Sequence, residues 1–168
     1  PDRDVAPEVK DHPEPREKPR NLAQRLALAK AQAGAVLAPG AVVLAADTVV
    51  SVGARILPKT EGDPAEARAC LELLSGRAHQ VTTAVAVLDA SGKARRRAVL
   101  TRVSFKRLTP AEIDGYLASN EWVGKAGGYG EQGVAGRFVI SVTGSYTGVV
   151  GLPLYETANL LASCGVRL

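Results

Sequence analysis

The sequence predicts a single α/β domain in which helices flank a mixed β-sheet. Three observations predict this class: apolar residues recur at helical spacing, valine- and threonine-rich segments alternate as strands do, and glycine and proline separate them. A chain of 168 residues with 46% hydrophobic residues has the length and composition of one globular core. We therefore expect one domain over residues 1–168, in which residues 1–18, rich in proline and charge, form a loop-like segment.

The first helix is expected to begin near Pro19, since proline suits the first turn of a helix, and to end at Gly34. Its apolar residues at helical spacing are Leu22, Leu26, Ala29 and Ala33. Lys30 lies off this apolar stripe, so we expect it to face solvent or a cleft.

A strand is expected next, over about residues 42–46, because Ala41–Leu44 is a continuous apolar run of the kind found in buried strands. Asp47 follows directly, at the mouth of that strand. A carboxylate there loses solvent unless a metal ion, a lysine or a substrate compensates it, although an ordinary turn cap or ion pair is the alternative. A hairpin around Gly53 should then lead into Ile56.

The middle of the chain predicts one helix and two long strands. Asp63 is a favourable N-cap for a helix that ends at Ser75-Gly76, with Ala67, Cys70, Leu71 and Leu74 as its apolar stripe. Residues 81–88 and 99–105 alternate as strands do and should pair antiparallel around a turn at 89–93. The basic run Arg95–Arg97 follows this turn and predicts a solvated surface cluster, because no aromatic residue is interleaved with it.

The last third of the chain is rich in glycine. Thr109 opens a short helix to Ala118 with the pattern of a capping box. Residues 124–136 then form a glycine-rich loop of the kind that lets the backbone approach a ligand closely. We expect a strand at 138–142, a second glycine loop at 144–151, and a final helix from Pro153 with one apolar face. The residues expected on that face are Leu154, Ala158 and Leu161.

Composition narrows the classes of function. The net charge of +4 favours anionic ligands in general, and no apolar run reaches the ~20 residues of a membrane span. The first twenty residues lack the pattern of a signal peptide. Cys70 and Cys164 predict free thiols and a cytoplasmic location, and His12 and His79 lack the companions of a zinc site, so His79 is expected to be structural.

Several charged residues are candidates for a site that binds an anionic ligand. Asp47 is the candidate to bind a divalent ion or to take a proton from water, and Asp11 could add a second carboxylate for the metal. Lys30, Lys59 and Lys125 are candidates to bind phosphate, with solvated surface charges as the alternative reading.

Gln132, inside the glycine-rich loop, could recognise the edge of a nucleobase through its amide, or could instead serve the turn. The residues by themselves therefore indicate a phosphate-binding α/β domain.

A set of short motifs occurs in order along the chain, and together they resemble one family. The motifs are Ala46-Asp47-Thr48-Val49-Val50, Ile56-Leu57-Pro58-Lys59, Leu74-Ser75-Gly76 with His79, Lys125-Ala126-Gly127-Gly128-Tyr129, Gln132-Gly133, and Gly144-Ser145-Tyr146 followed by Val149-Val150-Gly151-Leu152-Pro153-Leu154. They resemble the Maf family of nucleoside-triphosphate pyrophosphatases, also called septum formation inhibitor Maf. The resemblance runs from about residue 7 to residue 161.

This resemblance implies a Maf/ITPase-like fold and a cytoplasmic hydrolase that converts a nucleoside triphosphate to the monophosphate and diphosphate with Mg²⁺, Mn²⁺ or a similar ion. Asp47 matches the proton acceptor of the family, and Lys30 and Lys59 match lysines that neutralise the phosphates. Thr48 and Gln132 match positions linked to substrate choice, and the Asp-Thr pair resembles the branch that acts on dTTP, UTP or other non-standard pyrimidine nucleotides. A homodimer is a further expectation, whereas a membrane or nucleic-acid partner is not expected.

Four features depart from the family pattern. No Ser-x-Ser-Pro-Arg-Arg loop occurs in residues 1–168, so we expect an N-terminally truncated domain. Asp11 stands where the family has a glutamate, Gly130-Glu131 replaces the usual Ala-Ile, and Gly148 stands where asparagine is common. Two alternatives follow: a catalytically impaired relative that binds nucleotides and acts through partners, and a nucleic-acid binder that uses Arg95–Arg97 with Lys106 and Arg107.

Overall fold

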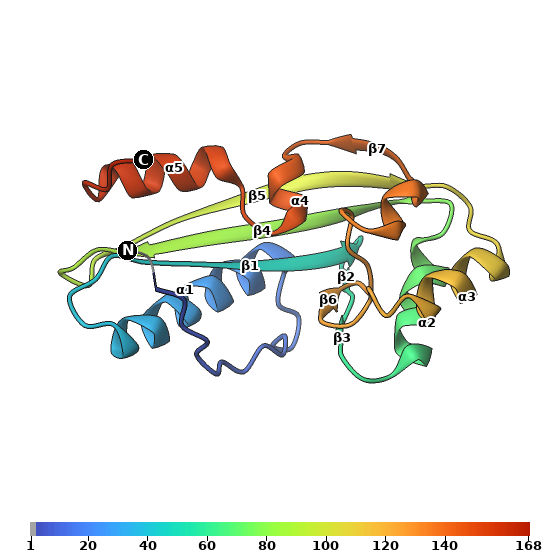
Figure 1. Cartoon of the computed structure of the whole chain (residues 1–168), viewed down its shortest axis with the longest axis horizontal. Helices are drawn as coiled ribbons and strands as arrows, with labels where there is room; N and C mark the ends of the chain where they lie inside the picture. The colour runs from blue at the N-terminus through green and yellow to red at the C-terminus, as the bar shows by residue number, and fades with distance from the viewer. Residues whose placement is uncertain (1–2) are drawn as a thin grey trace.

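The computed structural model describes residues 3–168, whose main element is a five-stranded sheet with helices on both faces (Figure 1). In spatial order its strands are β2 (Arg55–Ile56), β1 (Val43–Val52), β4 (Ala78–Leu88), β5 (Ala94–Phe105) and β7 (Val139–Thr143). A small second sheet pairs β3 (Lys59–Thr60) with β6 (Lys125–Ala126). The expected α/β domain is confirmed. Every strand pair among residues 3–168 is antiparallel, however, so the sheet does not mix directions as expected.

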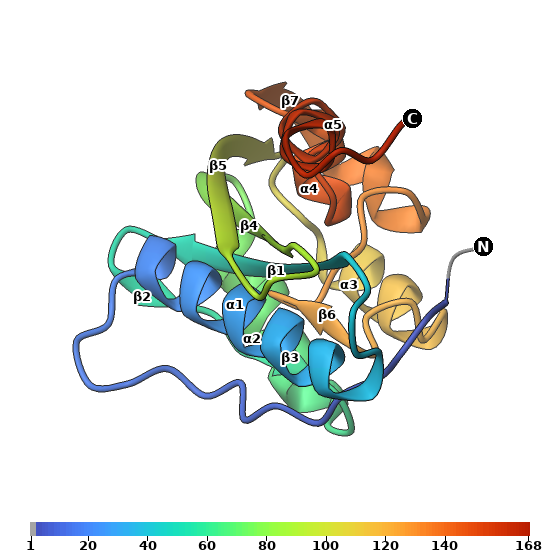
Figure 2. The same ribbon diagram turned by 90° about the vertical axis from the view of Figure 1, so that its left-hand side faces the viewer.

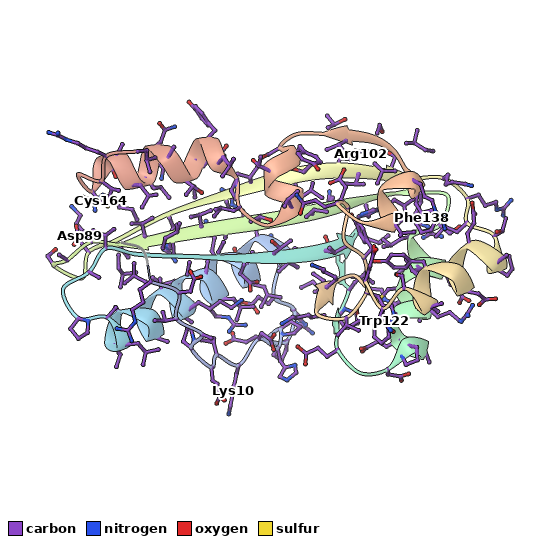
Figure 3. All side chains as sticks on the ribbon, in the orientation of Figure 1. Lys10, Asp89, Arg102, Trp122, Phe138 and Cys164 are labelled. Carbon is purple, nitrogen blue, oxygen red and sulfur yellow. The ribbon has the colours of Figure 1, made fainter. Side chains whose placement is uncertain are left out.

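The helices form two layers and one end of the molecule. The long helix α1 (Pro19–Leu37) covers one face of the sheet, and α4 (Tyr146–Val150) and α5 (Leu154–Ser163) cover the other (Figure 2). At one end of the long strands, α2 (Pro64–Leu74) and α3 (Pro110–Ala118) pack together with the 3-10 helix η1 (Val134–Phe138). Trp122 and Phe138 lie in the core at this end (Figure 3). Residues 3–18 contain no helix or strand.

Helix α1 runs three residues beyond its predicted end. Gly34 does not stop it, because this glycine is buried against β1: a Cβ at Gly34 would lie 3.1 Å from Cγ1 of Val43. The buried residues of the helix are Leu22, Ala23, Leu26, Ala27, Ala31 and Gly34. Ala29 and Ala33, expected on the buried stripe, are only partly buried. The small side chains at the true contact let the helix approach the sheet closely.

Strand β1 is twice as long as predicted, and Asp47 lies inside it rather than at its mouth. Pairing with β4 runs without interruption from Val43 to Ser51, so hydrogen bonding to the neighbouring strand carries the backbone past the charged residue. The prediction that Ala41–Leu44 is buried was wrong for most of the run, since Val43 is its only buried residue. The hairpin after β1 is confirmed, with Val52 paired to Arg55.

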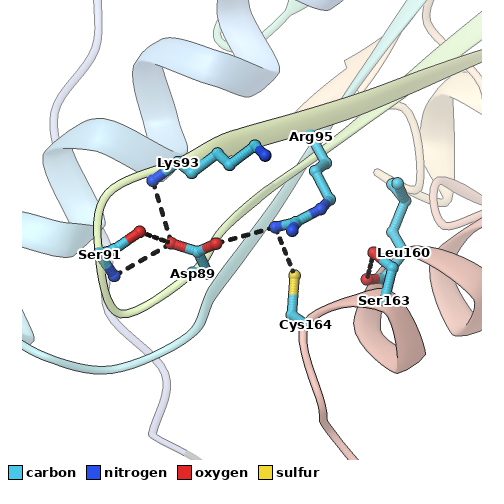
Figure 4. A network of polar contacts seen from close by, with 7 residues as sticks. All are labelled: Asp89, Ser91, Lys93, Arg95, Leu160, Ser163 and Cys164. Atoms are coloured by element: carbon cyan, nitrogen blue, oxygen red, sulfur yellow. Dashed lines mark hydrogen bonds and ion pairs between the residues drawn. The ribbon is translucent and has the colours of Figure 1, made fainter.

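The other predicted caps and pairs in the first two thirds are confirmed. Asp63 caps α2 by accepting a hydrogen bond from Ala65, Thr109 forms the capping box of α3, and β4 pairs antiparallel with β5. In the turn between these strands, Oδ1 of Asp89 accepts hydrogen bonds from Ser91 and Lys93 (Figure 4). Arg95 donates to Oδ2 of Asp89 at 2.9 Å, so this arginine is tied to the turn.

Two expectations for the C-terminal part were only partly right. Residues 144–151 are not only a loop, because the Ser145 hydroxyl accepts a hydrogen bond from the backbone of Gly148 and caps the short helix α4. Of the residues expected on the apolar face of α5, Leu161 packs against the core, whereas Leu154 is 57% exposed. The buried residues of the helix are Thr157 and Leu160. Packing of α5 on Val85 and Val87 of β4 decides which face is buried.

Cys70 and Cys164 are free thiols, as predicted. Among residues 3–168, no helix combines the length and the apolar character needed to cross a membrane.

The glycine-rich loop packs so closely on its neighbours that two of its glycines contact other elements directly. A Cβ at Gly127, whose φ is +67°, would lie 2.8 Å from Cγ1 of Val50 on β1. A Cβ at Gly128 would lie 3.4 Å from Cβ of Cys70 on α2. The loop is therefore fixed against β1 and α2.

We predict that Gly127→Ala lowers the free energy of unfolding by about 2–4 kcal/mol, because alanine adds both a left-handed backbone penalty and an overlap with Val50. Gly53→Ala is the matched control, since Gly53 also has a positive φ (+57°) but has no atom within 4 Å of an added Cβ. The control should cost only about 1–2 kcal/mol. Urea denaturation of both variants measures the difference, and equal losses would contradict the close packing of the loop.

Candidate active site

A cleft of about 870 Å³ lies between α1, β1 and the small β3–β6 sheet with its glycine-rich loop. Five consecutive residues of β1, Ala46–Val50, line it. Because successive strand residues point to opposite faces, such a run lines a cleft only along the edge of the strand. The site residues expected from sequence all line this one cleft: Asp11, Lys30, Asp47, Thr48, Lys59, Lys125 and Gln132.

The centre of the cleft is an ion pair between α1 and β1. Lys30 Nζ lies 2.5 Å from Oδ1 of Asp47, whose side chain is only 10% exposed. Asp47 shares its face of β1 with Val43 and Val49, which pack against α1, so the strand alternation aims its carboxylate at the helix. Lys30 therefore compensates the charge of Asp47, and an ion pair of this kind is also what the purely structural alternative predicted, so the catalytic role of Asp47 stays a prediction.

Burial raises the pKa of Asp47, and the hydrogen bond from Lys30 opposes this rise without cancelling it. Asp11 also raises the pKa of Asp47, and Lys59 lowers it. The carboxylate is thus a stronger base than an exposed aspartate, while a neighbouring ammonium group still favours its charged form.

Lys59 and Lys125 come from the two paired strands of the small sheet, in which Lys59 pairs with Ala126 and Thr60 with Lys125. Lys59 Nζ contacts Glu61 at 3.2 Å, but both side chains are largely exposed, so this ion pair holds the lysine weakly. The Thr60 hydroxyl donates to the backbone oxygen of Trp122 at 2.7 Å and fixes the strand below. Both ammonium groups are therefore available to an anion in the cleft.

Two tyrosines hold the glycine-rich loop in place. The hydroxyl of Tyr129 and Nε2 of His79 lie 2.7 Å apart, and the backbone N–H of Gly130 donates to the hydroxyl of Tyr116. His79 is buried on β4, and burial lowers its pKa to about 4, so the ring is neutral near pH 7. Its expected structural role agrees with this geometry: it anchors the loop from below.

Thr48 lies on the opposite face of β1 from Asp47. Its hydroxyl is 2.9 Å from that of Thr83, which donates to the backbone oxygen of Gly148 at 2.6 Å. These contacts join β1, β4 and α4. Thr48 still lines the cleft, and its expected contact with substrate stays a prediction.

Asp11 reaches the cleft from the segment before α1. Arg25 donates to the backbone oxygen of His12 at 3.1 Å and to Glu17 at 2.8 Å, which fastens this segment to the helix. In the part of the chain that the structure describes, no three His, Cys, Asp or Glu side chains are grouped as a metal site. The candidate metal ligands are thus only two carboxylates, those of Asp47 and Asp11. Two carboxylates can hold only an ion that also has other ligands, such as water or phosphate.

One cleft residue had no role in the sequence analysis. Glu131 follows Gly130 in the glycine-rich loop and lines the cleft, and its Oε2 is buried without a hydrogen-bond partner among residues 3–168. The departure of Gly130-Glu131 from the family pattern was the one signal in the sequence that pointed to it.

Comparisons with known proteins agree on one family. A family model described as Maf-like protein matches residues 3–164. A dTTP/UTP pyrophosphatase of Caulobacter vibrioides is 56% identical over 167 residues, which cover 99% of this chain and 86% of the relative. Proteins with the same name from Maricaulis maris and Novosphingobium aromaticivorans are 59% and 54% identical, and the alignments cover 94% and 99% of this chain and 74% and 82% of those relatives.

The raised pKa of Asp47 predicts how stability depends on pH. Since the folded state holds this proton more tightly than the unfolded chain, Asp47 stabilises the fold at low pH. That contribution is lost as pH rises from the unfolded pKa through the folded one. Asp47→Asn lacks this loss, so its stability relative to the wild type should be greater at pH 7 than at pH 3.

Lys30→Met supplies the comparison of opposite sign. Without the lysine, the pKa of Asp47 should rise further, and stability should fall more steeply between pH 4 and pH 8 than in the wild type. Urea denaturation at several pH values measures both variants. A pH-independent difference between wild type and Asp47→Asn would contradict the raised pKa.

Proposed function

Because this chain belongs to the Maf family, we propose that it hydrolyses nucleoside triphosphates to the nucleoside monophosphate and diphosphate, with dTTP and UTP as preferred substrates. The observation that carries the proposal is the buried Asp47–Lys30 pair in a cleft that Lys59 and Lys125 also line. A carboxylate suits the activation of water, and three ammonium groups suit a polyphosphate.

In the proposed reaction, a water oxygen attacks the α-phosphorus while the carboxylate of Asp47 accepts a proton from that water. The bond between the α-phosphorus and the bridging oxygen breaks, and diphosphate leaves with the electron pair. The raised pKa of Asp47 supports this role, because a general base acts best when its pKa is nearer the working pH.

The lysines neutralise charge that develops on the phosphate oxygens. Lys30 orients Asp47 in the free site, because its Nζ lies within hydrogen-bond distance of the Asp47 carboxylate. From the same position it can donate to the α-phosphate. Lys59 and Lys125 project from the small sheet and bind the outer phosphates. Hydrogen bonds from charged donors to phosphate are roughly twice as strong as neutral ones.

A divalent ion fits this arrangement. Mg²⁺ in nucleotide sites is commonly held by one or two carboxylates together with substrate phosphates, and Asp47 and Asp11 both line the cleft. We propose that these two acids hold Mg²⁺ or Mn²⁺, which would supply positive charge next to the α-phosphate when bound. The nucleobase would lie by the glycine-rich loop, which carries Gln132. Thr48 on β1 also lines the cleft, and these two residues are proposed to affect substrate choice.

The proposal extends to where and in what form the protein works. The two free thiols support a reducing compartment such as the cytoplasm. Exposed apolar side chains on β7 and α5, among them Ile140 and Tyr155, support a homodimer. No nucleic-acid partner is proposed.

The direct test measures diphosphate release from dTTP, UTP, CTP and GTP in the presence of Mg²⁺. We expect release of diphosphate from dTTP and UTP. Asp47→Asn removes the general base and should lower kcat by about 10²- to 10⁴-fold. Asp114→Asn on α3 is the control, because this exposed acid pairs with Arg68 outside the cleft. Binding of triphosphate without release would instead identify a nucleotide-binding relative. If the protein neither binds triphosphate nor releases diphosphate, the proposal is wrong.

Removal of metal gives a second test. Chelation with EDTA should reduce diphosphate release to background, and Mg²⁺ or Mn²⁺ should restore it. Because only two acids are proposed as protein ligands, calorimetry should show that Mg²⁺ binds more tightly when a non-hydrolysable triphosphate is present. Undiminished release in EDTA would refute a metal requirement.

A further inference from the structure

Tyr129 connects the buried core to the part of the glycine-rich loop that lies next to Lys125. Its side chain is 6% exposed and lines the cleft. Its ring packs edge-on against Phe105 and His79, with ring centroids 4.8 Å and 5.4 Å away. A ring packed on two aromatic neighbours has little freedom to move. Tyr129 therefore ties its part of the loop to the interior at one defined point.

The hydroxyl of Tyr129 has one hydrogen-bond partner among residues 3–168, Nε2 of His79 at 2.7 Å. The histidine has no other side-chain partner in the described chain, because its Nδ1 is buried and unpaired. Buried polar atoms are nearly always paired, so loss of this contact would leave both side chains unsatisfied. The contact therefore fixes the tyrosine against β4, the strand that carries His79.

Lys125 contacts the loop on both sides of Tyr129. Its backbone oxygen accepts a hydrogen bond from the N–H of Gly128 at 3.1 Å. Its side chain lies along the backbone at Gly130, where an added Cβ would be 3.3 Å from Cε and 3.9 Å from Nζ of the lysine. A displacement of Tyr129 would move both of these neighbouring residues.

No stronger contact fixes the Lys125 ammonium group. The residue is exposed, and none of the ion pairs between described residues includes it. A long side chain with a free end samples many rotamers unless its surroundings restrict it. The position of the loop backbone at Gly130 is therefore what limits where the ammonium group can lie.

We propose that Tyr129 is a positioning residue: its hydrogen bond to His79 holds the loop so that the ammonium group of Lys125 lies where the outer phosphates of a triphosphate bind. The inference rests on the proposed function, because it takes Lys125 as a phosphate-binding residue. The hydroxyl of Tyr129 is engaged by His79, so its effect on the ligand passes through Lys125.

Other contacts allow this role to be tested without unfolding the loop. The N–H of Gly130 donates to the hydroxyl of Tyr116 at 3.2 Å, and Gly127 packs directly on Val50. Both contacts remain in Tyr129→Phe, which keeps the aromatic ring and removes only the hydroxyl. This variant should therefore fold and place Lys125 less accurately.

The experiment is a double-mutant cycle between Tyr129 and Lys125, with inorganic tripolyphosphate as the probe. Calorimetry in EDTA at low ionic strength measures binding to the protein's own cations, without metal and without a base. Lys125→Met should weaken binding about 10- to 100-fold, as expected for one charged donor. Tyr129→Phe should weaken it about 3- to 10-fold when Lys125 is present. The same change should cost less than about twofold in Lys125→Met, because the lysine that it positions is gone.

Three further variants make the test specific. Tyr155→Phe is the matched control, since this tyrosine on α5 is 78% exposed and lies outside the cleft, and it should leave binding unchanged. His79→Gln keeps a side-chain amide that can pair with the Tyr129 hydroxyl, so it should bind tripolyphosphate more tightly than His79→Leu, which cannot pair. Urea denaturation of each variant separates loss of binding from loss of folded protein. If Tyr129→Phe does not fold, the two His79 variants enter the same cycle with Lys125→Met.

Three results would overturn the inference: no binding of tripolyphosphate by the wild type, equal binding by the wild type and Tyr129→Phe, or the same loss from Tyr129→Phe with and without Lys125. The last result would leave Tyr129 with a role in stability alone. Diphosphate release from UTP by the wild type is measured separately. A wild type that releases diphosphate while the two losses are additive would retain the proposed function and lose only the positioning role of Tyr129.

Discussion

The buried carboxylate of Asp47, in the middle of β1, governs how α1 packs and how the cleft is built. Asp47 lies inside β1, shielded from solvent, and its charge is tolerated because Lys30 reaches it from α1. That contact requires the helix to lie close to the sheet. Ala23, Ala27 and Ala31 provide the closeness, because each is fully buried and none extends beyond a methyl group. The packing of α1 thus serves both the core and the site.

The opposite wall of the cleft is held by different means. The glycine-rich loop carries Lys125, Glu131 and Gln132, yet it has almost no regular structure of its own. It is positioned by contacts from beneath: His79 with Tyr129, Tyr116 with the backbone of Gly130, and Gly127 against β1. A loop held in this way presents its side chains at defined positions, as a site that must discriminate between similar ligands requires. The aromatic cluster under the loop therefore fixes this wall of the cleft.

Local signals along the chain predicted much of the fold. The N-cap of α2, the capping box of α3 and the β4–β5 hairpin each depend on a few neighbouring residues, and each was found where expected. Predictions failed where a distant contact decided the outcome. Gly34 continues α1 because Val43 packs over it, and Leu154 is exposed because α5 lies on β4 through Leu160 and Leu161. No local pattern contains that information.

The same division applies to the site. The order of residues supplied the residue types: one acid in an apolar strand, lysines in three separate segments and a loop unusually rich in glycine. Folding then brought Lys30 against Asp47 and turned Thr48 away from that acid toward Thr83. Glu131 shows the difference clearly, because the burial of its Oε2 without a hydrogen-bond partner is a property of the folded chain. The physical reason is that charge and conformational preference are properties of single residues, whereas burial and hydrogen-bond pairing depend on which distant segments pack together.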